Sequence, residues 1–149
     1  IGSKCFDFEG VKTETLKLVN NGILDNYLVD TYNGKKLNLK SNGRSGGTTN
    51  LYFENGNINY EDLLKSHSKI LYVTETIGHG TNLVTGDYSV GATGFLVENG
   101  EFKYPINEIT IAGNFKDMFQ NITLANDLEF EYSVNSPTMM VEGMVVAGK

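Results

Sequence analysis

The stretch GFLVENGEFKY, residues 94–104, decides the fold class. Strand-forming residues lie on both sides of Asn99-Gly100. Both central residues of a type I′ turn need a positive φ, and Asn followed by Gly accepts it at low cost. The spacing therefore predicts an antiparallel hairpin in which residues 94–98 pair with residues 101–104.

The same dipeptide occurs four more times along the chain. It stands at Asn21-Gly22, Asn33-Gly34, Asn42-Gly43 and Asn55-Gly56. All but Asn42-Gly43, which falls in a loop at residues 40–49, lie between strand-like runs. These runs span residues 13–20, 23–32, 35–39, 50–54 and 57–60. Successive hairpins of this kind favour an antiparallel meander.

Two short segments have helical signals, and three further runs have strand signals. Residues 60–66 follow the potential cap Asn59, and residues 114–122 begin at the potential cap Asn114 and carry apolar residues at spacings of three and four. The further strands are expected at residues 70–75, 127–132 and 138–147. The sequence thus predicts a single domain, residues 1–149, of the mainly β (α+β) class with two short helices.

Composition excludes several classes of protein. Twelve Lys and Arg against 18 Asp and Glu give a net charge of −6, which disfavours direct nucleic-acid binding. No apolar run approaches the roughly 20 residues of a membrane-spanning helix. A single cysteine, Cys5, excludes a disulfide framework.

Catalytic and metal-binding patterns are weak in this sequence. The two histidines, His67 and His79, lack metal-ligand spacing, and no nucleophile elbow is present, so no catalytic or metal-ligating residue is predicted. The carboxylate pairs Asp7 with Glu9 and Glu129 with Glu131 are interpreted as the solvated face of a strand. The Gly-rich stretch 77–94 favours close approach of a backbone, from either a neighbouring strand or an extended peptide ligand.

Several motifs, in order, point to a known family. TETIGHGTNLVTGDYSVGATGF (74–95) is followed by VENGE (97–101), YPI (104–106), EITIAGNFKDMFQNI (108–122) and NDLE (126–129), and FDFEGV (6–11) precedes them. Together they resemble the C-terminal part of the TldD/PmbA family, in its PmbA (TldE) branch, which is labelled as modulators of DNA gyrase. Phe8 replaces an Asp of the family's FDDEGV segment.

The resemblance implies a fold and a role. The fold would be a large antiparallel sheet, curved and barrel-like, with a peptide path on its inner side. In the TldD branch an HExxxH helix and a later Cys hold zinc. That helix would precede residue 1, and the later Cys would fall within residues 127–137, which contain none. We therefore expect a non-catalytic subunit of a cytoplasmic metalloprotease complex, with no cofactor in this chain and zinc only in a TldD-type partner.

The implied partners are a TldD-like protease subunit or a second copy of this chain, and unfolded peptides, with no nucleic acid and no membrane. The residues expected along the peptide path come from the longest motif. They are Gly78, His79, Gly80, Asn82, Thr85, Gly86, Asp87, Tyr88, Ser89 and Gly91. For Asp87 and Tyr88, packing at a turn and rim is an equal alternative.

Two other functions are compatible with the sequence. In the first, this domain is the substrate wall of an active homo-oligomeric metallopeptidase. In the second, it is a modulator that binds DNA gyrase as a protein partner, since a charge of −6 opposes contact with DNA but not with protein. Because the family's proteins are about three times longer and Ile1 is not Met, we also expect a fragment whose open strand edges self-associate.

Overall fold

The computed structural model describes residues 2–148, and the contacts within it divide the chain into two compact units. Unit 1 runs up to Phe53 and includes Glu129–Ser136, whereas unit 2 contains Glu54–Leu128 and the residues from Pro137 onward. No helix in the described part of the chain is both long and apolar enough to cross a membrane.

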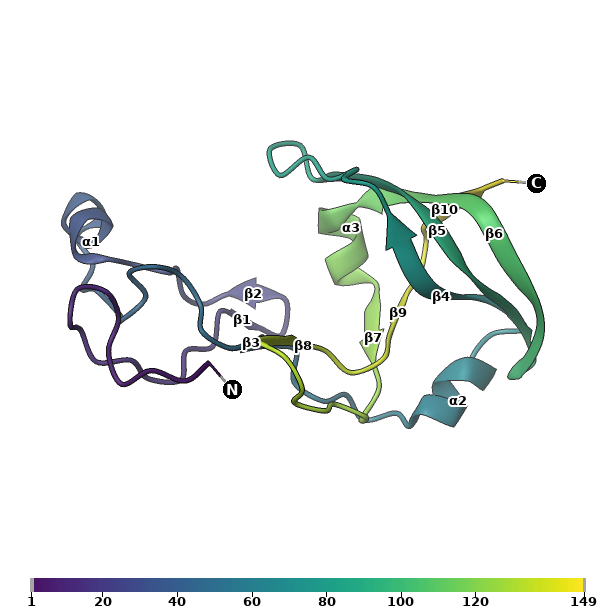
Figure 1. Ribbon diagram of the computed structural model, residues 1–149, viewed down its shortest axis with the longest axis horizontal. Coiled ribbons are helices and arrows are strands. Elements are labelled where there is room, and N and C mark those ends of the chain that lie inside the picture. Colours follow the sequence, from purple (N-terminus) through teal and green to yellow (C-terminus); the bar gives the residue numbers. More distant parts are fainter. Residues whose placement is uncertain (1, 149) are drawn as a thin grey trace. The chain divides into compact units, whose positions relative to one another are not determined.

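Unit 2 is built on a four-stranded antiparallel sheet with the order β10-β6-β5-β4 (Figure 1). The strands are β4 (Lys69–Ile77), β5 (Asp87–Glu98), β6 (Glu101–Asn114) and β10 (Val145–Ala147). The long β5–β6 hairpin turns at Asn99 and Gly100, whose φ angles are 54° and 82°. The hairpin predicted from residues 94–104 is confirmed.

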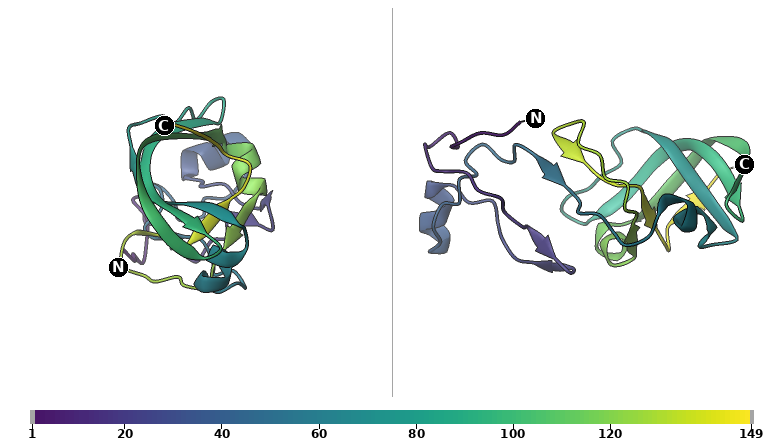
Figure 2. Two further views of the ribbon diagram at one scale, coloured as in Figure 1. Left: turned by 90° about the vertical axis from the view of Figure 1, so that its right-hand side faces the viewer. Right: turned by 90° about the horizontal axis from the view of Figure 1, so that it is seen from below.

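Two irregularities in strand register meet at Gly94 and bend this sheet. Ala92 pairs with Ile109 but Gly94 pairs with Ile106, so β6 carries one extra residue there. A second register shift lies opposite, between Val73 and Glu75 of β4. A Cβ atom on Gly94 would stand 1.9 Å from the Tyr72 carbonyl oxygen, so only glycine fits. Such bulges increase bend and twist, and the sheet is visibly curved (Figure 2).

The expected fold class is therefore confirmed as mainly β with an antiparallel, curved sheet. The described strands leave β4 and β10 at the two outer edges of this sheet, so the sheet is open and does not close into a barrel. Its core face buries Val90, Ala92, Ile109 and Ile111, with Tyr88 and other apolar side chains packed against them.

The two predicted helices are present in unit 2 and use the predicted caps. The side chain of Asn59 accepts the Asp62 N–H at the start of α2 (Tyr60–Lys65), and that of Asn114 accepts the Lys116 N–H at the start of α3 (Phe115–Gln120). After α3, β7 (Ile122–Leu124) pairs antiparallel with β9 (Met139–Val141).

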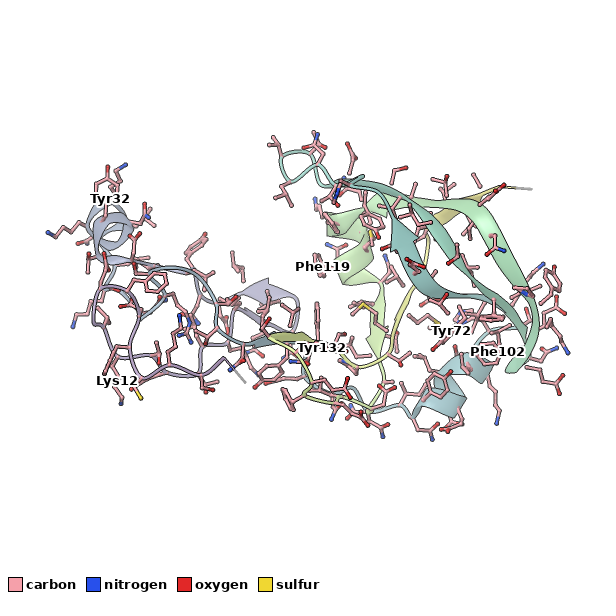
Figure 3. The ribbon with its side chains drawn as sticks, viewed as in Figure 1. Lys12, Tyr32, Tyr72, Phe102, Phe119 and Tyr132 are labelled. Carbon is pink, nitrogen blue, oxygen red and sulfur yellow. The ribbon has the colours of Figure 1, made fainter. Side chains whose placement is uncertain are left out.

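An aromatic cluster joins α2 to the sheet. Tyr72 of β4 meets Phe102 of β6 edge to face, with ring centroids 5.2 Å apart (Figure 3), and it meets Tyr60 of α2 at 6.4 Å. Burial and then a hydrogen bond with Tyr72 raise the pKa of Tyr60 to about 12.

Unit 1 has little regular structure. A short hairpin joins β1 (Val19–Asn20) to β2 (Ile23–Leu24) through Asn21 and Gly22, as predicted, although both strands are much shorter than expected. The strands β3 (Leu51–Tyr52) and β8 (Val134–Asn135) form a parallel pair, which departs from the expected all-antiparallel arrangement.

A third helix, α1 (Thr31–Leu37), replaces the hairpin expected at Asn33-Gly34 and the strand expected at residues 35–39. The Asp30 side chain accepts the Asn33 N–H at the first turn, and Asn38, with a φ of 55°, ends the helix. Gly34 is buried, and a Cβ there would lie 2.8 Å from the Leu39 carbonyl oxygen. The glycine thus serves close packing rather than a type I′ turn.

The hairpin expected at Asn55-Gly56 is also wrong. Gly56 donates its N–H to the Ala125 carbonyl, and a Cβ on Gly56 would stand 1.7 Å from the Leu124 carbonyl oxygen. Of residues 57–60, expected as a strand, Ile58 makes only an isolated parallel bridge to Ala125, and Tyr60 already begins α2. Gly56 is again required by a close approach of two backbones.

The strand expected at residues 127–132 is absent, and the one expected at 138–147 is divided between β9 and β10. The side-chain amide of Asn135 explains why residues 127–132 do not form a strand. Its Oδ1 accepts the N–H groups of Glu131 and Tyr132, and its Nδ2 donates to the Tyr132 carbonyl, which fixes a tight turn. Glu129 and Glu131 therefore do not lie on a strand face. Gly143, with a φ of 78°, separates β9 from β10.

Candidate functional site

The ten candidate residues lie on one connection of unit 2, the 78–86 loop and the start of β5. The loop projects beyond the ends of β4 and β5, beside the start of α3 (Figure 1). Its stem continues the pairing of the two strands, because Thr81 forms an antiparallel bridge with Tyr88 and Ser89 donates its N–H to the Gly80 carbonyl at 2.7 Å.

The tip of the 78–86 loop is closed by Asn82. Its Oδ1 accepts the N–H groups of Val84 and Thr85 at 3.0 and 3.3 Å. Its backbone N–H donates to the Asp87 carbonyl and its own carbonyl accepts the Gly86 N–H, both at 2.8 Å. An asparagine side chain that hydrogen-bonds the backbone two residues on is a recognised turn-forming device. The role of Asn82 here is therefore to shape the loop.

Asp87 is tied to the same network. Its Oδ2 accepts the Thr85 hydroxyl at 2.7 Å, and its Oδ1 accepts Nδ2 of Asn114 at 3.2 Å. These two hydrogen bonds, the one from Thr85 first, hold the pKa of Asp87 below its ordinary value. The carboxylate is thus ionised near neutral pH and engaged in bonds within the chain.

Asn114 joins the loop to α3. Besides capping that helix, it donates from Nδ2 to the Thr85 carbonyl at 3.0 Å. The Phe115 N–H donates to the Gly86 carbonyl at 2.8 Å. The first turn of α3 therefore fixes the C-terminal half of the loop.

The glycines of the motif have separate structural reasons. Gly78 and Gly86 have φ angles of 96° and 81°, which side-chain-bearing residues rarely adopt. Gly80 has a Cβ position 1.4 Å from the Ser89 carbonyl oxygen, whereas the Cβ position of Gly91 meets its nearest atom only at 3.4 Å. The glycine-rich stretch was expected to admit either a neighbouring strand or a peptide ligand. At Gly80 the close backbone is that of the neighbouring strand β5.

The other candidate side chains do not join the network. The Tyr88 ring lies 5.5 Å from that of Phe115 and packs against the core, which fits the packing alternative. His79 and Ser89 are exposed. The structure thus brings Asn82, Thr85 and Asp87 together and leaves His79 and Ser89 facing solvent.

Sequence reasoning missed the two residues at the loop tip. The side chains of Leu83 and Val84 are 87% and 95% exposed. The sequence does contain a signal for them, because two adjacent aliphatic residues interrupt an otherwise polar, glycine-rich turn. Leu83 and Val84 carry no chemistry of a catalytic or polar binding site, so a search for such motifs does not find them.

The described residues do not fit a metal ion. Within residues 2–148 no three His, Cys, Asp or Glu side chains gather closely enough to hold one. Nε2 of His67 lies 3.0 Å from a carboxylate oxygen of Glu142, and its Nδ1 lies 3.0 Å from the Ser66 hydroxyl. Cys5 is exposed in unit 1.

The carboxylates Asp7 and Glu9 in unit 1 also have structural partners, and no strand contains them. Asp7 accepts the N–H groups of Ser45, Val11 and Glu9, and Glu9 accepts the N–H and hydroxyl of Thr31. Burial acts to raise the pKa of Asp7, but these backbone hydrogen bonds together lower it. The pair organises a turn rather than the solvated strand face expected.

Comparison with known proteins identifies the family. Residues 1–148 match the PmbA/TldA metallopeptidase C-terminal domain. The chain is 47% identical over 99% of its length to a metalloprotease PmbA homologue from Buchnera aphidicola subsp. Baizongia pistaciae, and 44% identical over 100% of its length to metalloprotease PmbA from Escherichia coli O157:H7. It covers 34% and 33% of those two proteins, about a third of their length.

Solved structures agree with this match. A Thermotoga maritima protein named as a candidate modulator of a DNA gyrase aligns with a TM-score of 0.90 at 34% identity, over 98% of this chain and 36% of its own. TldE from Thermococcus kodakarensis aligns with a TM-score of 0.81 at 27% identity, over 97% of this chain and 36% of its own. The chain therefore belongs to the PmbA/TldD metallopeptidase family and corresponds to its C-terminal domain.

Proposed function

We propose that this chain is the C-terminal domain of a PmbA/TldE-like subunit of a cytoplasmic TldD/PmbA-type zinc metalloprotease complex. The subunit does not itself catalyse hydrolysis, and it helps to bind or present unfolded peptide. The observation that carries the proposal is a difference in identity. The chain is 44–47% identical to two PmbA proteins but 28% identical to a TldD homologue from Buchnera aphidicola subsp. Acyrthosiphon pisum over a similar length.

The region expected to supply a cysteine ligand in the TldD branch supports a non-catalytic role. Residues 127–137 contain no cysteine. Two polar side chains of this segment make hydrogen bonds within the chain. Asp127 accepts the N–H and hydroxyl of Thr138, and Nδ2 of Asn135 donates to the Tyr132 carbonyl.

Peptide binding is supported by the outer position of β4 in the unit 2 sheet. An extended peptide can add to such an edge through main-chain hydrogen bonds alone, without a motif of polar side chains. Gly78, His79 and Gly80 follow directly after β4, so a peptide along this edge would pass them. The hydrogen bonds made by Asn82, Thr85 and Asp87 would fix the backbone of the loop at this end of the peptide path.

The proposed partner is a TldD-like chain, because the family includes both kinds of protein and this chain resembles the PmbA kind. In the test, the full-length protein and a TldD-type protein from the same organism are purified separately and given fluorescently labelled, unfolded casein. We expect cleavage by the mixture, and none by this protein alone. Zinc-dependent cleavage by this protein alone would overturn the proposal in favour of a homo-oligomeric peptidase.

A further inference from the structure

The five Asn-Gly pairs differ in how firmly the fold holds them, and the difference bears on their chemical stability. An asparagine that precedes glycine readily loses its side-chain amide, because the glycine nitrogen attacks Cγ with no side chain of its own in the way. Ring closure requires rotation about the Cα–C and Cα–Cβ bonds of the asparagine. A fixed backbone and a hydrogen-bonded amide therefore both oppose the reaction, which then waits for local opening of the chain.

Two pairs in unit 1 are held through the asparagine side chain. Oδ1 of Asn42 accepts the Val29 N–H at 3.0 Å, and its Nδ2 donates to the Tyr27 carbonyl at 2.7 Å. Asn33 lies inside α1, and its Nδ2 donates to the Asp30 carboxylate at 3.1 Å. Both amides are thus kept from the rotation that ring closure needs.

A third pair, in unit 2, is held at both of its residues. Oδ1 of Asn55 accepts the Leu128 N–H at 2.9 Å. The attacking nitrogen would be that of Gly56, whose N–H donates to the Ala125 carbonyl at 2.8 Å. Neither reacting group of this pair is free to move.

Asn21-Gly22 is held least. Both residues are exposed, and a Cβ on Gly22 would meet no atom within 4 Å. Within residues 2–148, neither the Asn21 side chain nor the Gly22 N–H forms a hydrogen bond. The pair joins β1 to β2, two strands of two residues each that make up a sheet of their own. An isolated two-stranded hairpin is marginally stable, so this turn opens easily.

Asn99-Gly100 is the matched comparison, because it forms a turn with the same positive φ angles. Its hairpin is far longer, since β5 has 12 residues and β6 has 14. The Asn99 N–H donates to the Ser68 carbonyl at 3.1 Å, and the Cβ position of Gly100 lies 2.5 Å from Cγ of Lys65. The same dipeptide is therefore presented once in a short hairpin and once in a firmly held one.

We propose that Asn21 is a site of spontaneous modification, at which its amide is converted to a carboxylate through a cyclic imide. The deprotonated nitrogen of Gly22 attacks Cγ of Asn21. The N–Cγ bond forms, the Cγ–Nδ2 bond breaks, and Nδ2 leaves as ammonia after taking up one proton from solvent. Water then opens the ring. Cleavage of the N–Cγ bond leaves an aspartate, whereas cleavage at the backbone carbonyl carbon leaves an isoaspartate.

Both products alter the hairpin of unit 1. Each adds one negative charge near neutral pH to a chain whose net charge is already −6. Isoaspartate also places one additional carbon atom in the backbone between β1 and β2, which changes the turn that sets their register. The inference is independent of the proposed function, because it uses only groups of this chain and water.

The test follows all five pairs in one sample of the full-length protein. The protein is incubated in mildly alkaline buffer, with and without urea, and digested at intervals. Mass spectrometry of the peptides gives the fraction of each asparagine that has become acidic, and electron-transfer fragmentation distinguishes aspartate from isoaspartate. The remainder of the subunit is present, so a covering of Asn21 by it would appear as a lack of reaction.

In the native protein we expect Asn21 to react at least about tenfold faster than Asn33, Asn42 and Asn55, and at least about threefold faster than Asn99. In urea the five rates should agree within about threefold, because the fold no longer separates the pairs. A native rate at Asn21 no higher than that of the three held pairs would overturn the proposal. A lead of Asn21 that is equally large in urea would also overturn it, since the cause would then lie outside the fold.

Discussion

Gly80 and Ser89 approach so closely that a Cβ atom on Gly80 would stand 1.4 Å from the Ser89 carbonyl oxygen, while the Ser89 N–H donates to the Gly80 carbonyl at 2.7 Å. The glycine-rich motif is thus, at this position, a device that brings the loop stem against β5. The same motif also contains Gly91, but there a side chain would meet its neighbours only at ordinary van der Waals distances.

Gly80→Ala is therefore expected to destabilise the protein by about 2–4 kcal/mol, because the two backbones must separate to admit the methyl group. Gly91→Ala is the matched control and should change the free energy of unfolding by no more than about 1 kcal/mol, since alanine also lowers the entropy of the unfolded chain. Urea denaturation followed by circular dichroism measures both. Equal stability of the two variants would contradict the close-approach account.

Asn114 is expected to link helix capping to the order of the 78–86 loop. Asn114→Ala removes the cap and both Nδ2 hydrogen bonds, at a cost of about 1–2 kcal/mol, and should speed hydrogen exchange at the Gly86 amide. Asn121→Ala, at the other end of α3, removes one bond to the Asp117 carbonyl and should leave Gly86 exchange unchanged. Equal effects at Gly86 would show that the loop does not depend on Asn114.

Asp87 should make stability depend on acidity. Its pKa lies below 3.8 in the folded chain because of the Thr85 hydroxyl and Asn114. Stability from the ionised form is therefore fully present above the unfolded pKa and is lost as the pH falls through the lower, folded pKa. The stability difference between the native protein and Asp87→Asn should be largest near pH 7 and shrink below pH 3.8. A constant difference from pH 7 to pH 2.5 would contradict this.

Tyr60 should titrate at unusually high pH. Its pKa of about 12 lies above the ordinary 10.0 because the ring is partly buried and its hydroxyl is hydrogen-bonded to Tyr72. Stability from neutral Tyr60 is complete below about pH 10 and is lost as the pH rises toward 12. Tyr72→Phe should move the Tyr60 pKa toward 10, as followed by NMR of ¹³C-labelled tyrosine. An unchanged titration would exclude the hydrogen bond as a cause.

The isolated 149-residue chain is expected to self-associate. The sheet of unit 2 ends in β4 on one side and β10 on the other, and exposed strand edges pair with other chains. Thr76→Lys, a charged substitution at an exposed position of β4, should weaken this association. Light scattering measures the mass of the species in solution. A native chain that is monomeric at a concentration of about 100 µM would contradict the expectation.

The Asn-Gly pairs show how far the sequence predicts the fold. At Asn21 and Asn99 the dipeptide forms the expected turn, because φ is positive at both its residues. At Gly34 and Gly56 the glycine is needed because a backbone carbonyl oxygen, that of Leu39 and that of Leu124 respectively, occupies the space of a side chain. Dipeptide chemistry cannot distinguish these two needs, since only the packed chain shows which atoms lie beside the glycine.

The candidate loop shows the same division. The motif predicts its place between two strands, and it names Asn82, Thr85 and Asp87 as candidates for a peptide path. The motif does not reveal that Asn114, which lies 27 residues beyond Asp87 in sequence, donates hydrogen bonds to the Thr85 carbonyl and to the Asp87 carboxylate. A contact of that range is set by the β5–β6 hairpin, whose register places Asp87 opposite Asn114.

We propose that this protein is the non-catalytic subunit of a two-chain zinc protease. The most direct measurement is the zinc content of the full-length protein and of a separately purified TldD-type protein, by inductively coupled plasma mass spectrometry after identical dialysis. We predict about one zinc per chain in the TldD-type protein and none above background in this one. Stoichiometric zinc in this protein, retained through dialysis, would contradict the claim.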